Sequence, residues 1–106
     1  SLCTNKKILL TVSPETATFD LNTEGDGYDD VVLTVTADGG TVTVGDIYIG
    51  DTKLTKTTHY TVDGGKVTLL KTYLDDLTEG DYTITIETDQ GDVTATIAVV
   101  DTIEEG

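Results

Sequence analysis

The sequence predicts an all-β protein, an antiparallel sandwich of about seven to nine short strands, and three observations carry this prediction. Apolar and polar residues alternate with a period of two along most of the chain, as in strands buried on one face. Threonine occurs 23 times in 106 residues, and its β-branched side chain suits the solvent face of a strand. Glycine-containing turns separate the runs about every eight to twelve residues, a spacing typical of sandwiches.

The alternation places the elements in order along the chain. Strands are expected at 8–12, 17–21, 31–37, 42–49, 60–62, 67–69, 82–87 and 93–99, with a short piece at 53–54. Turns are expected at 38–40, as a hairpin, and at 50–51, 63–65 and 89–92, because glycine accepts the positive φ of tight turns. The pattern breaks at Gly45-Asp46, which predicts a bulge. Residues 71–76 lack alternation and predict one short helical turn.

The apolar side of the strands predicts a core between two sheets. Its expected members are Phe19, Val31, Leu33, Val35, Tyr60, Val67, Leu69, Ile84, Ile86, Ala95 and Ile97. The segment LTEGDY contains Leu77, Gly80 and Tyr82 in the spacing of a tyrosine corner, in which the phenol bonds to nearby backbone. This corner makes the expected sandwich immunoglobulin-like and gives Tyr82 a structural role.

Charge excludes several classes of partner. Acidic residues number 20 and basic residues 6, for a net charge of -14, so nucleic acid and anionic membrane surfaces would repel the chain. No apolar run is long enough to insert in a bilayer. The acidity predicts a protein whose charge opposes self-association and keeps it monomeric. The alternative interpretation is that the acidic residues bind a cation.

We expect one domain at 8–100, an acidic linker at 101–106, and a linker or cloning remnant at 1–7. Cys3 is the single cysteine, so no internal disulfide can form.

Four strings resemble one family of modules: SPETATFDLN (13–22), HYTVDGGKVT (59–68), LLKTYLDDL (69–77) and LTEGDYTITI (77–86). Over residues 8–100 the chain is similar to the immunoglobulin-like X-two modules of cellulosomal scaffoldins and bacterial cellulases. The resemblance implies a non-catalytic accessory module of an extracellular protein that degrades polysaccharides, either a spacer and solubiliser or a weak contact to plant or bacterial cell-wall polysaccharide. Its other partners would be adjacent modules of the same chain.

Two departures from the family pattern stand out: His59 replaces an Asp, and the loop 23–30 is longer and more acidic. The alternative function is a structural or adhesive immunoglobulin-like domain of a bacterial surface repeat protein.

No enzyme is expected. Catalysis needs a general acid or base, a nucleophile or a metal. His59 is the only histidine, and no Ser or Cys motif lies beside it. Asp75 and Asp76 are neighbours in the sequence, which is no sign of a carboxylate pair across a cleft. We therefore expect no catalytic residue.

Sugar contacts would need exposed aromatic faces. The chain has no Trp, so the five tyrosines are the candidates. Alternation predicts that Tyr60 and Tyr82 are buried and that Tyr73 caps the core. Tyr28, in the acidic loop, and Tyr48, which points away from its apolar neighbours, are therefore the expected carbohydrate contacts.

The acidic stretch Asp20 to Asp30 has two interpretations, and no other cofactor is expected. Asp20, Asn22 and Glu24 are spaced by two and precede Gly25, as at the start of a calcium loop, so the candidate ligands are Asp20, Asn22, Glu24, Asp26 and Asp30. The twelfth position is Val31 instead of a bidentate Glu. Alternatively, Asp20 and Asn22 are turn formers that bond local backbone.

Overall fold

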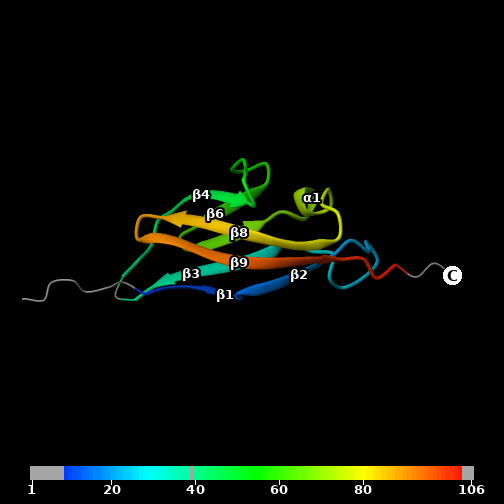
Figure 1. Ribbon diagram of the computed structural model, residues 1–106, viewed down its shortest axis with the longest axis horizontal. Coiled ribbons are helices and arrows are strands. Elements are labelled where there is room, and N and C mark those ends of the chain that lie inside the picture. The colour runs from blue at the N-terminus through cyan, green and yellow to red at the C-terminus, as the bar shows by residue number, and fades with distance from the viewer. Residues whose placement is uncertain (1–8, 39, 104–106) are drawn as a thin grey trace, which may run out of the picture.

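The computed structural model describes residues 9–38 and 40–103 as two packed β-sheets and one short helix (Figure 1). The first sheet has the order β1 (Leu10–Ser13), β3 (Val31–Ala37), β7 (Lys66–Leu69) and β6 (Tyr60–Asp63). The second has the order β2 (Thr16–Asp20), β9 (Gly91–Val100), β8 (Gly80–Thr88), β4 (Val44–Ile49) and β5 (Thr52–Lys53). Helix α1 (Lys71–Leu74) lies within the segment predicted to turn. The sandwich prediction is confirmed.

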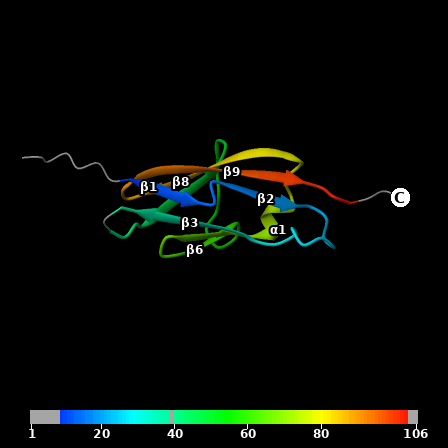
Figure 2. The ribbon, with the colours of Figure 1, turned by 90° about the horizontal axis from the view of Figure 1, so that it is seen from below.

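The strands of the two sheets lie in two layers (Figure 2). The core lies between these layers and is built from alternate side chains of the longer strands. Every residue that the alternation assigned to the core is buried, and Phe19, Leu33 and Ile97 have no exposed surface. The core also includes Val12, Val42, Ile47, Ile49, Leu54, Leu74, Val93 and Val99. One continuous hydrophobic layer therefore holds the sheets together.

One strand pair departs from the antiparallel prediction. β1 is antiparallel to β3 in the first sheet, whereas β2 is parallel to β9 in the second. Pro14 lies between β1 and β2 and has no N–H to donate to a ladder, so pairing is interrupted there. The chain then continues in the second sheet, and Thr16–Asp20 pairs with residues 96–100 of β9.

The hairpin predicted at 38–40 does not join two neighbouring strands of one sheet, although an isolated antiparallel bridge does pair Ala37 with Gly40. Gly39 itself lies outside the described residues. β3 and β4 belong to different sheets, so this segment is a crossover, although the backbone N–H of Gly40 does bond to the carbonyl oxygen of Ala37 at 3.3 Å. Thr43 then docks on the second sheet, since its N–H donates to the side chain of Asp89 at 2.9 Å. Asp-Gly-Gly indicates a turn, but it does not tell which sheet the next strand joins.

The other turn predictions are confirmed. β6 and β7 form a tight hairpin around Gly64, whose φ is +62°. At Gly65 a Cβ atom would collide with the carbonyl oxygen of Val35, so the close approach of β7 to β3 needs a glycine there. The register of β4 against β8 shifts between Val44 and Ile47, which is the bulge expected at Gly45-Asp46.

The tyrosine corner forms as predicted. The Tyr82 hydroxyl donates to the carbonyl oxygen of Thr78 at 2.7 Å and lies 3.1 Å from the Thr78 hydroxyl. Tyr82 packs against the core but is half-buried, not buried as expected, because it sits near the start of β8 with its phenol turned back to the corner. The bond ties the segment before β8 to the second sheet.

Leu33 provides a test of the core. Leu33→Ala is expected to lower the free energy of unfolding by about 2–5 kcal/mol, because it removes buried apolar atoms and leaves a cavity. Denaturant unfolding measures this change. Thr34→Ala, on the exposed face of the same strand, should change it by less than about 1 kcal/mol. Equal effects of the two substitutions would contradict the assigned core.

Tyr82→Phe tests the corner, since it removes only the hydroxyl. The loss of its bond to Thr78 should lower the free energy of unfolding by about 1 kcal/mol. Tyr48→Phe is the control, because the alternation turns Tyr48 away from the core. An unchanged denaturation midpoint for Tyr82→Phe would show that the corner bond does not stabilise the fold.

Candidate functional site

His59 has a structural position. The backbone N–H of Thr55 donates to its Nδ1 at 2.9 Å, and its ring lies 4.5 Å from the ring of Tyr73. These contacts shape the segment that leads into β6. An Asp carboxylate, which the family pattern has here, can accept the same N–H, so the departure preserves this bond. Asp75 and Asp76 are both exposed just after α1.

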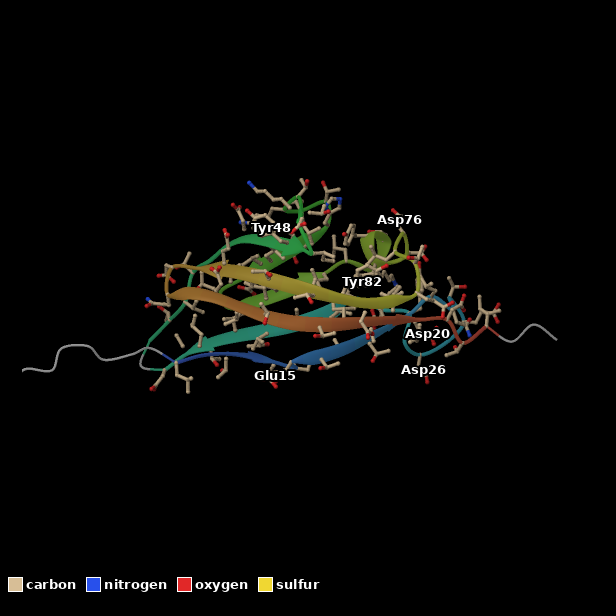
Figure 3. All side chains as sticks on the ribbon, in the orientation of Figure 1. Glu15, Asp20, Asp26, Tyr48, Asp76 and Tyr82 are labelled. Atoms are coloured by element: carbon tan, nitrogen blue, oxygen red, sulfur yellow. The ribbon has the colours of Figure 1, made fainter. Side chains whose placement is uncertain are left out.

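Tyr48 lies on the outer face of the five-stranded sheet (Figure 3). Its neighbours Ile47 and Ile49 are buried, so the half-buried Tyr48 ring points away from the core, as the alternation predicts. Tyr48 is in register with Thr85 of β8 and Lys53 of β5. These residues form a row across the sheet, and the row continues into β9, where Thr94 pairs with Thr85.

Tyr28 is not exposed as expected; it is half-buried against the core. Its ring centroid lies 5.5 Å from that of Phe19, and Lys71 Nζ lies 5.6 Å from the Tyr28 ring centroid. Desolvation, followed by the charge of Asp75, raises the pKa of the Tyr28 phenol. The ring is thus occupied by protein contacts. Tyr28 packs on Phe19 of β2, whereas Tyr48 lies on the outer face of β4, and β9 and β8 separate these two strands in the sheet, so the two rings do not form one binding surface.

Asp20 anchors the end of the described chain to the sandwich. The carboxylate belongs to a residue that is only 8% exposed, and Oδ1 accepts the N–H groups of Asn22 at 3.0 Å and Thr102 at 3.1 Å. Oδ2 accepts the hydroxyl of Thr102 at 2.7 Å. The bonds from Asn22, then those from the Thr102 side chain, hold the pKa of Asp20 below its ordinary value. We call this arrangement the Asp20 clasp.

The neighbouring polar side chains also bond to backbone. Asn22 Oδ1 accepts the N–H of Glu24 at 3.0 Å, and Asp30 Oδ1 accepts the N–H of Lys71 at 2.8 Å. The Asn22 bond is local and matches the turn-former interpretation, whereas the Asp30 bond joins the loop to the start of α1, 41 residues further along the chain. Within residues 9–38 and 40–103, no three His, Cys, Asp or Glu side chains gather where they could hold a metal. Glu24 and Asp26 are exposed, and calcium binding by this loop stays a prediction.

A groove that the sequence did not predict lies beside Tyr48, between strands β5 and β6 at the edge of the sandwich. It has a volume of about 490 Å³ and is lined by Val44, Gly45, Asp46, Lys53, Leu54, Thr55, Lys56 and Tyr60. We call it the edge groove. The bulge at Gly45-Asp46 was the signal for it, since bulges redirect side chains at sheet edges.

Comparison with known proteins identifies the chain's relatives. The model of a family described as carbohydrate binding domain X2 matches residues 12–99. Cellulose-binding protein A of Clostridium cellulovorans is 37% identical over 81 residues, which is 76% of this chain but 4% of that protein. The chain therefore spans a small fraction of that relative's length.

Two solved structures share the fold. A module of the cellulosomal scaffoldin CipC of Clostridium cellulolyticum superposes with a TM-score of 0.57 at 23% identity, covering 93% of this chain and 97% of that one. A tri-modular GH5 endo-β-1,4-glucanase of Bacillus licheniformis gives 0.69 at 21% identity, covering 87% of this chain and 18% of that one. No helix among the residues described is long and apolar enough to cross a membrane.

Asp20→Asn tests the clasp through pH. The lowered pKa means that the ionised carboxylate stabilises the fold above its unfolded pKa, near 3.8, and that this contribution disappears as pH falls through the lower folded pKa. Asp20→Asn should therefore be less stable than the unsubstituted protein at neutral pH, with the difference shrinking in acid below that range. Denaturant unfolding at a series of pH values measures this difference. Asp26→Asn, an exposed acid of the same loop, is the control; a difference for Asp20→Asn that does not vary with pH would contradict the clasp.

The same variant also tests the calcium loop. If the loop binds Ca²⁺ only when folded, a hundredfold excess over the dissociation constant should raise stability by about 2.7 kcal/mol. Melting curves are compared in Ca²⁺, in chelator and in salt of equal ionic strength. A Ca²⁺-specific rise that Asp20→Asn abolishes would establish the site, and identical curves in Ca²⁺ and matched salt would reject it.

Proposed function

Because the chain belongs to the carbohydrate binding domain X2 family, we propose that it is a non-catalytic accessory module of an extracellular, polysaccharide-degrading protein. The observation that carries this proposal is the extent of the match. Residues 12–99 begin in β1 and end in β9, so the family unit and the sandwich coincide. Cellulose-binding protein A, of which this chain matches a small part, fits a module within a longer chain.

The geometry supports a spacer. β1 begins at one end of the molecule and β9 finishes at the other, so the chain enters and leaves at opposite ends (Figure 1). The Asp20 clasp holds residue Thr102 against the end of the sandwich. A net charge of -14 keeps such a spacer hydrated and opposes self-association.

A weak polysaccharide contact is best placed on the outer face of the five-stranded sheet. Tyr48 offers an aromatic ring there, and the flanking Thr85 and Thr94 offer hydroxyls in the same row. The flat face of an aromatic ring packs on the C–H groups of a pyranose, and the hydroxyls bond to its oxygens. One ring is a small platform, so the contact is expected to be weak.

Retention on insoluble cellulose and on isolated bacterial cell walls tests the contact. Tyr48→Ala should weaken retention about tenfold, equivalent to about 1.4 kcal/mol, while the protein stays folded. Val32→Ala is the control, because Val32 is an exposed apolar side chain on the other sheet. Equal retention of the two variants would contradict the Tyr48 contact, and release of soluble sugar by the protein alone would contradict the non-catalytic role.

A further inference from the structure

We propose that the edge groove is a subsite for one unit of a neutral glycan with adjacent free hydroxyls, a proposal that rests on the polysaccharide contact above. The groove lies at one edge of the sandwich, where residues of β4 and of the outer strands β5 and β6 line it. β5 has only two residues and is an outer strand of the second sheet, and β6 is an outer strand of the first. The register of β4 against β8 shifts between Val44 and Ile47, and Gly45 and Asp46, which lie within this shift, line the groove.

A charged pair stands at the groove. Lys53 Nζ lies 3.4 Å from Asp46 Oδ2, and the two side chains remain 60% and 48% exposed. The ammonium donates hydrogen bonds and the carboxylate accepts them. Adjacent hydroxyls on a sugar ring can accept from Lys53 and donate to Asp46 at the same time, so this pair matches a diol.

Tyr60 supplies a third polar group from the other sheet. The residue is only 3% exposed, yet it lines the groove. Within the described residues no buried side-chain oxygen or nitrogen lacks a hydrogen-bond partner. Among the residues that the structure describes, the Tyr60 hydroxyl has no hydrogen-bond partner, so its oxygen is accessible to solvent, and we place this access at the groove that the residue lines. Desolvation, then the charge of Asp46, raises the pKa of Tyr60, so the phenol, which is neutral at neutral pH, remains a hydrogen-bond donor.

Apolar groups complete the lining, since Val44 and Leu54 also border the groove. Sugar rings present C–H groups beside their hydroxyls, so a mixed lining suits them. Lys53 pairs with Tyr48 on β4, and side chains directly opposite each other in a sheet share a face. Lys53 therefore joins the edge groove to the Tyr48 face, and one glycan chain can contact both.

Charge favours a neutral ligand over an anionic one. Lys53 is offset by Asp46 at 3.4 Å, and the protein as a whole carries a charge of -14. A polyuronate would be repelled by this field, whereas a neutral glycan would not.

Titration of the protein with cellotetraose, followed by amide chemical shifts, tests the subsite. Shifts should move for residues 44–46, 53–56 and 60, with a dissociation constant on the order of 1 mM. Lys53→Met and Tyr60→Phe should each weaken binding about tenfold. Lys66→Met, which removes an exposed lysine from β7 in the first sheet, should leave it unchanged. Unfolding curves check that each variant is folded, and Lys53→Met tests the subsite even if Tyr60→Phe destabilises the core.

The outcomes separate this subsite from the contact it rests on. Tighter binding of tetragalacturonate than of cellotetraose would overturn the proposal that the ligand is a neutral glycan. Shift changes confined to the Tyr48 face, with Lys53→Met and Tyr60→Phe binding normally, would overturn the subsite and leave the contact standing. Absence of binding to cellotetraose, together with absence of retention on insoluble polysaccharide, would overturn both.

Discussion

The strands of the sandwich, except the two-residue β5, bury alternate side chains against the opposite sheet, and the positions of the polar groups follow from this. Because Ile47 and Ile49 must face the core, Tyr48 between them must face outward. The same rule sends Thr83 and Thr85 of β8 and their partners Thr96 and Thr94 of β9 to the outer surface. A one-residue slip in register would reverse both faces, so the burial that stabilises the fold also determines which side chains a partner can meet.

At the edges of the sheets the alternation of buried and exposed side chains is less strict. The interrupted strand at Pro14, the short β5 and the edge groove all lie at these edges. An edge strand leaves backbone groups unpaired, so proteins shorten, bend or interrupt it. Pro14 interrupts the edge formed by β1 and β2, and the second sheet ends in the very short β5. At that end Asp46, Lys53 and Tyr60 come together from three strands. The groove is thus a consequence of how the open edge is finished.

Local patterns predicted most of the fold, because burial and turns depend on nearby residues. The core residues from Phe19 to Ile97, the Gly64 turn and the Tyr82 corner all follow from spacings of a few positions. Long-range partners did not follow. The crossover after Ala37 and the parallel pairing of β2 with β9 depend on which sheet a strand joins, which alternation does not encode. The edge groove was missed for the same reason, since its residues come from separate strands, and Tyr28 was misplaced because packing on Phe19 overrode its polar surroundings.

Asp20 shows how a local and a long-range role combine in one carboxylate. Its bond to the Asn22 N–H is a turn within three residues, whereas its bonds to Thr102 join the end of β2 to a residue 82 positions further along the chain, just after β9. Charge-assisted bonds of this kind are stronger than neutral ones, so they hold the departing chain in one direction. In the proposed role, the clasp fixes residue Thr102 at one end of the module while Tyr48 and the edge groove lie on its side, so neighbouring modules would connect in line and a polymer would be touched laterally. The proposed spacer role and the proposed weak polysaccharide contact are then compatible, because they use different parts of the same module.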